Sequence, residues 1–363
     1  MKLDTLLVPL LLSTPLALAH HSATVHYDQG AEITHENITV KAWSFTNPHA
    51  RLVFEAPHSL TGEMVEWTSQ STNVNSLARK GYHAEYFAPG EVVTVIGNPS
   101  RDGRPDMDTR RIIRADGRVV DFLERAENAP PPAALVSASY DDARDFSGVW
   151  ENTGDPIPEE VIAELVPEDA FFWIASTQGE VQTDTERSRG EIRGLPLTEE
   201  GLAFFEQWTP AYDECRPTSG WMGQSAPFLH ELDKPRGGRL QIRTEYQDQE
   251  RTIWLDGRTH PPLDRAPRTI QGHSSGHWDG DTLVVETVHM LPNQITRNGV
   301  YHSENAVMTE RIFRDGDLIT WLRVLEDPDY LTQRIASILQ YRRAPYPEVL
   351  PYGTCTLQQQ DAR

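Results

Sequence analysis

Three histidines lie close together near the start of the chain, at His20, His21 and His26 in the stretch LALAHHSATVHYD. A fourth, His49, directly follows a proline in the stretch TNPHA, and a proline fixes the backbone of the turn that would present the imidazole. Imidazole nitrogens bind copper, zinc and related ions well. The pattern therefore predicts a metal site; the alternative is that the first histidines are frayed terminal residues and His49 only belongs to a turn.

An apolar stretch precedes these histidines and has the form of a secretory signal. Lys2 supplies a positive charge, residues 5–16 form a short apolar core, and Ala17-Leu18-Ala19 is a small-x-small cleavage site. The apolar core is well short of the roughly 20 residues that span a bilayer. We therefore expect residues 1–19 to be removed on export, a periplasmic or secreted protein, and no transmembrane segment in the mature chain.

Cleavage between Ala19 and His20 would change the chemistry of His20. The residue would gain a free α-amino group, whose pKa near 8 lets a metal ion displace its proton more easily than that of a lysine (about 10.4). The amine, the His20 imidazole and one further histidine form a T-shaped set of three nitrogens, a histidine brace, which suits Cu(II). We expect copper as the cofactor, with His20, His21 and His49 as ligands; His21 could instead contribute its imidazole together with the intervening backbone amide.

A second group of candidate residues lies in the other half of the chain. Successive side chains of a strand point to opposite faces, so His273, Ser275 and His277 share one face of one predicted strand. His302 and Glu304 share a face of a later one. If both faces look into a barrel lumen, the group could bind a ligand or a metal, or perform acid–base chemistry through His277 or through His302 and Glu304. The alternative is a hydrogen-bonded structural network or plain exposure to solvent.

The composition limits the class of protein that must position these residues. The chain has 363 residues and a formal charge of −21, which argues against nucleic acids and anionic membrane surfaces as partners. Frequent Pro and Gly, nine tryptophans and few long helical patterns favour an all-β fold. The two cysteines, Cys215 and Cys355, are expected to pair in an oxidising compartment. Neither has C-x-x-C spacing, so redox catalysis and zinc are disfavoured.

The first half predicts a small β domain over residues 20–125. Its strand-like stretches end at Gly, Asn, Pro or Asp, and VNSLARKGY has helical spacing up to a glycine. Strands of this size with one short helix indicate a small OB-like barrel or a sandwich. The stretch 126–145 follows, and its proline triplet with flanking Ala, Ser and Asp predicts a linker.

The second half predicts a larger β domain over residues 146–363. Helical stretches are expected at 158–174 and at 198–208, where Thr198 is a plausible N-cap. Two hairpins follow, with turns at Asp279-Gly280-Asp281 and at Asp315-Gly316-Asp317. Consecutive hairpins form an antiparallel meander, which can close as a barrel or half-barrel.

Both halves carry motifs that resemble families of exported bacterial proteins. The start His20-His21-Ser22 and the pattern W-x-x-x-N-P-H in WSFTNPH are similar to a family of small exported proteins of unknown function, whose members usually have an aromatic residue where Ala23 stands here. The stretches RTIWLDGRTHPP, GHSSGHWDGDTLVVET and HSENAVMTERIFR resemble an uncharacterised exported group that is loosely called lipocalin-like. The resemblances imply export and a lipocalin-like second barrel, and they assign no activity.

These observations lead to an exported binding protein as the expected function. The first domain would bind copper through His20 with help from His21 and His49, and the second barrel would pack around a small apolar or amphipathic ligand. One alternative is an enzyme that acts on a small molecule in the second barrel, with catalytic residues among His273, His277, His302 and Glu304. Another is a structural module that interacts with the cell envelope. The sequence points to no particular protein partner.

Overall fold

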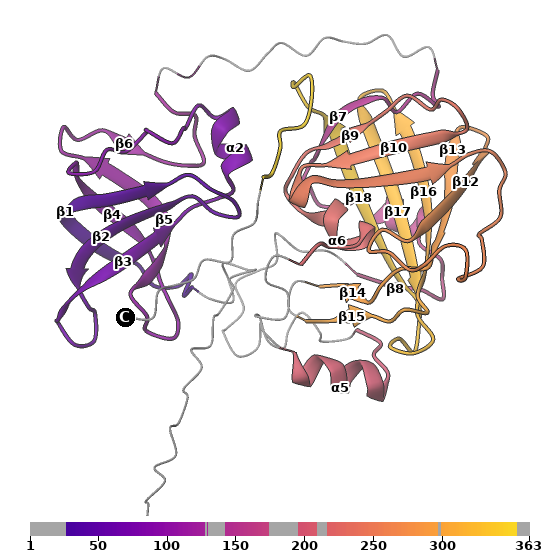
Figure 1. The fold of residues 1–363 in the computed structure, drawn as a ribbon, viewed down its shortest axis with the longest axis horizontal. Coiled ribbons are helices and arrows are strands. Elements are labelled where there is room, and N and C mark those ends of the chain that lie inside the picture. The colour runs from indigo at the N-terminus through magenta and orange to yellow at the C-terminus, as the bar shows by residue number, and fades with distance from the viewer. Residues whose placement is uncertain are drawn as a thin grey trace, which may run out of the picture.

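The computed structural model describes residues 27–127, 129, 142–173, 195–208, 216–296 and 299–353. Figure 1 shows that these residues form two β-barrels with a few short helices, so the all-β prediction is confirmed. The predicted signal, His20, His21 and His26 lie outside the described residues, as do both cysteines of the expected disulfide, Cys215 and Cys355. Most of the predicted linker, 126–145, also lies outside them.

The first barrel has the topology of an OB-fold. Its sheet follows the order β3-β2-β1-β4-β5-β6, and a parallel pairing of β3 with β5 closes five of these strands into a barrel. The helix α2 lies between β3 and β4, as in other barrels of this type. The elements are β1 (Ile33–Ser44), β2 (Arg51–Pro57), β3 (Met64–Gln70), α2 (Val74–Arg79), β4 (Val92–Pro99), β5 (Asp106–Arg114) and β6 (Val119–Val120).

Alternating side chains explain how this barrel forms its core. On β2 the buried residues Leu52, Phe54 and Ala56 alternate with more exposed ones, and the buried set packs with Trp67 of β3. The predicted helix is confirmed at α2, where the Asn73 side chain caps the first turn by accepting a hydrogen bond from the backbone of the third residue.

The second barrel is larger and closes nine strands of a ten-stranded sheet. The order is β17-β16-β13-β12-β11-β10-β9-β7-β18-β8, and pairing of β17 with β18 closes the barrel. A separate two-stranded sheet consists of β14 (Asn293–Gln294) and β15 (Tyr301–His302). The barrel strands are β7 (Gly148–Asn152), β8 (Phe171–Phe172), β9 (His230–Leu232), β10 (Arg239–Thr244), β11 (Gln249–Trp254), β12 (His273–Asp279), β13 (Thr282–Val288), β16 (Val307–Asp315), β17 (Leu318–Glu326) and β18 (Ile335–Arg343).

The two predicted Asp-Gly-Asp hairpins are confirmed. Strand β12 pairs with β13, and β16 with β17. The glycines Gly280 and Gly316 are the first central residues of these two-residue turns and both have φ of 58°, as a type II′ turn requires. One pairing departs from the expected antiparallel meander, because β11 and β12 are parallel. The chain between them, residues 255–272, is long enough to return to the same end of the barrel.

Within the described residues, three helices accompany the large barrel. They are α3 (Glu159–Leu165), α5 (Glu199–Gln207) and α6 (Gly220–Ser225), and a 3-10 turn, η2 (Tyr246–Asp248), joins β10 to β11. Thr198 caps α5 as predicted. The prediction of a helix over 158–174 is confirmed in its first half and wrong in its second. The observed helix α3 ends at Leu165, and Phe171 begins the strand β8. Pro167 explains the end, because the residue before a proline disfavours helical backbone and proline has no N–H to donate.

The segment after β18, residues 344–353, lies between the two barrels, and we call it the C-terminal strap. Tyr352 packs against Phe228 of the large barrel. The amide of Asn75 donates to the carbonyl of Leu350, and the amide of Asn47 donates to the carbonyl of Tyr352 at 2.9 Å. The strap therefore belongs to the core of one domain and forms hydrogen bonds with the other (Figure 1).

Burial of His230 predicts a loss of stability in mild acid. Its side chain is buried beside Thr244, and burial lowers the pKa of His230 to about 4. Below about pH 6.5 the unfolded chain binds a proton that the folded chain does not, so stability falls as the pH drops from about 6.5 toward 4. Between pH 7 and 5 this group should remove about 2 kcal/mol of the free energy of unfolding, measured by urea titration.

The His230→Gln variant should lose correspondingly less stability over that pH range. His277→Gln, which changes an exposed histidine of the same barrel, is the matched control. Equal pH dependence in the wild type and in His230→Gln would contradict the prediction.

Candidate functional site

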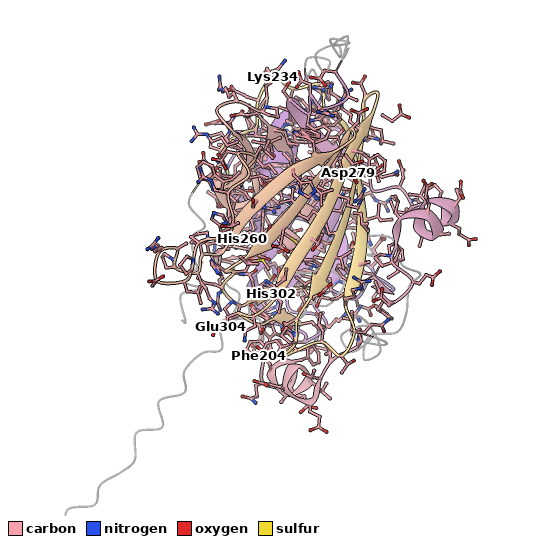
Figure 2. The ribbon with its side chains drawn as sticks, turned by 90° about the vertical axis from the view of Figure 1, so that its right-hand side faces the viewer. Phe204, Lys234, His260, Asp279, His302 and Glu304 are labelled. Atoms are coloured by element: carbon pink, nitrogen blue, oxygen red, sulfur yellow. The ribbon has the colours of Figure 1, made fainter. Side chains whose placement is uncertain are left out.

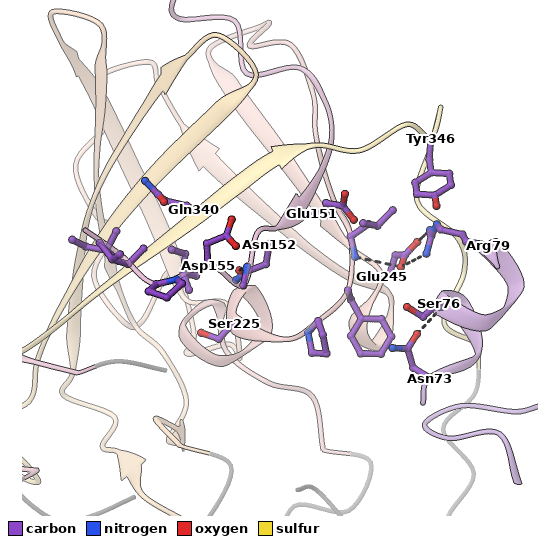
Figure 3. Close-up of a pocket in the computed structure, with 18 of the residues that line it drawn as sticks. Asn73, Ser76, Arg79, Glu151, Asn152, Asp155, Ser225, Glu245, Gln340 and Tyr346 are labelled. Atoms are coloured by element: carbon purple, nitrogen blue, oxygen red, sulfur yellow. Dashed lines mark hydrogen bonds and ion pairs between the residues drawn. The ribbon is translucent and has the colours of Figure 1, made fainter. Parts of the chain in front are cut away.

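A cavity of about 540 Å³ lies between the small barrel and the large one. Its wall on one side comes from α2, and the wall on the other side comes from β7, β18, the residues after α6 and the C-terminal strap (Figure 3). Apolar and polar side chains both line it: Asn73, Ser76, Arg79, Lys80, Glu151, Asn152, Gly154, Asp155, Pro156, Ile157, Ile162, Phe172, Ser225, Pro227, Phe228, Leu229, Glu245, Ile338, Leu339, Gln340 and Tyr346. Sequence analysis did not predict this site.

A buried ion pair forms one end of the cavity. Arg79 of α2 pairs with Glu245, which follows β10, and their side chains are 10% and 1% exposed. Glu245 also accepts hydrogen bonds from the backbone N–H of Leu350 at 2.7 Å and of Leu229 at 3.3 Å. The Arg79 guanidinium lies 4.9 Å from the ring centre of Tyr346, and burial lowers the pKa of Arg79 to about 10, which leaves it charged near neutral pH.

The remaining charged groups of the cavity are largely paired. Glu151 accepts a hydrogen bond from Arg342 at 2.8 Å. The Lys80 ammonium donates to the carbonyls of Phe122 and Leu123 at 2.9 Å each. Asp155, by contrast, is exposed at the cavity. A ligand would therefore meet few charges that still need a partner.

His49 is the one predicted metal ligand that falls within the described residues. It is half-buried, and its Nδ1 lies 2.9 Å from the carbonyl oxygen of Ser71. A carbonyl oxygen only accepts, so Nδ1–H is the donor, and in the neutral ring Nε2 carries the lone pair. This is the arrangement that orients metal-binding imidazoles in other proteins.

Tyr27 lies by the same end of β3 as this histidine. It forms a bridge with Ser100, and its hydroxyl donates to Asp106 at 2.8 Å. Burial raises the pKa of Tyr27 and raises that of Asp106 to about 6. Asp106 pairs with Thr68 on β3, three positions before Ser71, the residue that orients His49.

The predicted second site is not assembled in the barrel lumen. On β12 the buried residues are Ser274 and Gly276, so His273, Ser275 and His277 face outward. The inner face of this strand carries Ser274, Gly276 and Trp278, so a single apolar side chain is all that distinguishes it from the outer face in the sequence. His302 and Glu304 do not share a strand either: β15 ends at His302, which is fully buried, whereas Glu304 is exposed (Figure 2).

One of these histidines belongs to a hydrogen-bonded chain on the outer wall. The Nδ1 of His273 lies 2.8 Å from the Nδ1 of His260, and the Nε2 of His260 lies 3.1 Å from a carboxylate oxygen of Glu286. Burial, followed by the nearby charge of His260, lowers the pKa of His273. Among the described residues, no three histidine, cysteine or acidic side chains are grouped so that they could hold a metal ion.

Side chains fill the lumen of the large barrel. Arg251 and Glu310 form an ion pair whose side chains are 4% and 0% exposed, and Trp321 donates to Glu310 at 3.0 Å. The fully buried Arg323 donates to the carbonyl of Trp221 in α6, which covers this network. A cavity of about 10 Å³ remains beside α6. The ligand that the sequence predicted for this barrel stays a prediction; the described side chains beside α6 leave little space there.

Removing Arg79 should destabilise the protein strongly. Arg79→Met leaves the Glu245 carboxylate buried without its cation, and breaking a buried pair in this way costs about 3–5 kcal/mol. Lys41→Met is the control, because Lys41 pairs with Glu55 and Glu66 on the surface, where solvent screens the pairs and they contribute little to stability. Urea unfolding measures both variants. If Arg79→Met lowers the free energy of unfolding as little as the control does, the prediction is wrong.

Residues 10–108 match the model of a family of unknown function, DUF6152. This match is consistent with the resemblance of the first half to an uncharacterised family, and the lipocalin-like resemblance of the second half stays a prediction. No curated protein and no solved structure matches the chain. No helix within the described residues is long and apolar enough to cross a membrane. Residues 10–108 are thus similar to a family of unknown function.

Proposed function

We propose that this chain is an exported binding protein whose small-molecule site is the cavity between the two barrels. The observation that carries the proposal is the cavity itself, whose volume of about 540 Å³ falls within the range of about 300–1,000 Å³ typical of ligand sites. Such sites occur preferentially at domain interfaces, and this one has walls from both domains. The alternative of an enzyme has less support, because none of His273, His277, His302 and Glu304 lines the cavity.

Binding of a neutral apolar fluorophore tests this proposal. N-phenyl-1-naphthylamine should bind the full mature chain at one site with enhanced emission. Ile157→Trp places an indole in the cavity and should weaken binding by about tenfold or more, because the larger side chain occupies the volume of the probe. Leu202→Trp, an equivalent change on the exposed face of α5, should leave the affinity unchanged. Absence of binding by the wild type, or equal binding by Ile157→Trp, would overturn the proposal.

We also propose that the small domain binds copper through His20, His21 and His49 after export. The hydrogen bond from Nδ1 of His49 to Ser71 supports this, because it orients the ring and makes Nε2 the basic nitrogen. The position of Tyr27 also supports it. Tyr27 lies seven positions after His20, and a stretch of that length reaches at most about 23–25 Å when extended. Ser71 lies three positions after Thr68, about 10 Å along the chain, so the reach of that stretch exceeds the distance along β3.

Copper titration of the mature protein, followed by EPR, tests the second proposal. The chain that starts at His20 should bind one Cu(II) with nitrogen hyperfine structure. His20→Ala and His49→Ala should each weaken binding by about a hundredfold or more, since loss of a ligand costs more than loss of its outer hydrogen-bond partner. His277→Ala, in the other domain, is the control. If His20→Ala binds Cu(II) as tightly as the wild type, this proposal fails.

A further inference from the structure

We infer that the cavity between the barrels takes a neutral, largely apolar molecule that carries a carbonyl or hydroxyl oxygen. The inference rests on the proposed small-molecule function and adds the chemical class of the ligand. Three features of the cavity lead to it: the pairing of its charges, the two amide groups that face it, and its apolar wall.

The paired charges argue against a charged ligand. Arg79 is bound to Glu245, Glu151 to Arg342, and Lys80 to two backbone carbonyls. A ligand carboxylate that entered this cavity would lose hydration, and every cation there already has a partner. Loss of hydration without a new partner costs an ionised group a large free energy. The same holds for an ammonium group near the buried end, because the Glu245 carboxylate already has three partners there.

Two asparagine side chains supply hydrogen-bond donors from opposite sides. The Oδ1 of Asn73 accepts from the backbone of Ser76 at 2.8 Å, and the Oδ1 of Asn152 accepts from the backbone of Gly154 at 2.9 Å. These bonds fix the orientation of both amides. Their NH₂ groups donate to no other group that the structure describes, although both residues line the cavity. Asn73 belongs to the small domain and Asn152 to the large one (Figure 3). Amide N–H groups bind acceptor oxygens, which carbonyl and hydroxyl groups offer.

The apolar wall lies on the side of the large barrel. Ile157, Ile162 and Phe172 pack as partly buried residues against the outer face of β18, and all three line the cavity. These three side chains expose apolar surface to the cavity. A ligand with a hydrocarbon portion would remove this surface from water, and that burial would favour binding.

The exposed carboxylate of Asp155 is the one feature that would favour a cation over a neutral molecule. Its exposure places it in water of high dielectric constant, where a single ion pair contributes little. The two amide donors both line the cavity and come from its two walls, so a ligand oxygen can meet a donor on either side. A cationic ligand is therefore the less favoured outcome and is included in the test.

Competition against N-phenyl-1-naphthylamine separates the ligand classes in the full mature chain. Dodecanol, dodecanoate and dodecylammonium share one hydrocarbon chain and differ in the charge of the head group. Dodecanol should displace the fluorophore at a concentration about tenfold lower than either ion. Equal or better displacement by dodecanoate or by dodecylammonium would overturn the inference.

Isosteric variants test the role of the two amides. Asn152→Asp and Asn73→Asp keep the oxygen that accepts the backbone N–H and replace the donor by an acceptor, so the local fold is preserved. Each variant should bind dodecanol roughly threefold to tenfold more weakly, which is the contribution of one hydrogen bond. Each should bind dodecylammonium more tightly, because the new carboxylate attracts the cation. Asn37→Asp, the same change on the exposed face of β1, should alter neither ligand. Unchanged dodecanol affinity in both cavity variants would also overturn the inference.

The outcomes separate this inference from the proposed function. If the fluorophore does not bind the wild type at all, the binding site fails and the ligand class fails with it. If the fluorophore binds and Ile157→Trp blocks it, but dodecanol has no advantage over the ions, the binding site stands and only the ligand class is wrong.

Discussion

The buried ion pair between Arg79 and Glu245 is the contact on which the arrangement of the two barrels depends. A carboxylate that is 1% exposed has lost nearly all its hydration, and the protein must replace it. The replacement comes from a guanidinium of the small domain, from a backbone N–H of the large barrel, and from a backbone N–H of the C-terminal strap. These three segments are far apart in the chain. The Glu245 carboxylate is therefore satisfied only when α2, the strap and the large barrel are together.

The cavity follows from that contact. Arg79 and Glu245 form its buried end, and the walls that continue from them belong to different domains. The distance between the Asn73 and Asn152 amides is consequently set by the domain arrangement and not by either barrel alone. Inside the large barrel, the described side chains of Arg251, Glu310 and Arg323 with their partners occupy the part of the lumen that α6 covers. The cavity with walls from both domains therefore depends on how the two barrels pack together.

Short sequence patterns were enough to predict several helices and hairpins, whereas the cavity depends on contacts between residues far apart in the chain. The Asp-Gly-Asp turns, the capped helix after Thr198 and the short helix after Asn73 each depend on residues within one turn of chain, and the structure bears them out. The inner face of β12 is marked in its sequence by Trp278 alone, because Ser274 and Gly276 on the same face are no more apolar than the residues of the outer face. The cavity could not be predicted either, since Asn73, Asn152 and Glu245 meet only through tertiary packing.

The N-P-H motif connects the two proposed sites through one loop. Asn47 accepts a hydrogen bond from Val74 in the first turn of α2, and its amide donates to the strap at Tyr352. His49, two residues later, is oriented by Ser71 at the end of β3. The asparagine therefore helps to dock α2, which lines the cavity, while the histidine presents its ring to the region that Tyr27 anchors. Of this motif, only His49 was predicted to have a role as a ligand. The role of Asn47 could not be predicted, because it depends on a segment about 300 residues away.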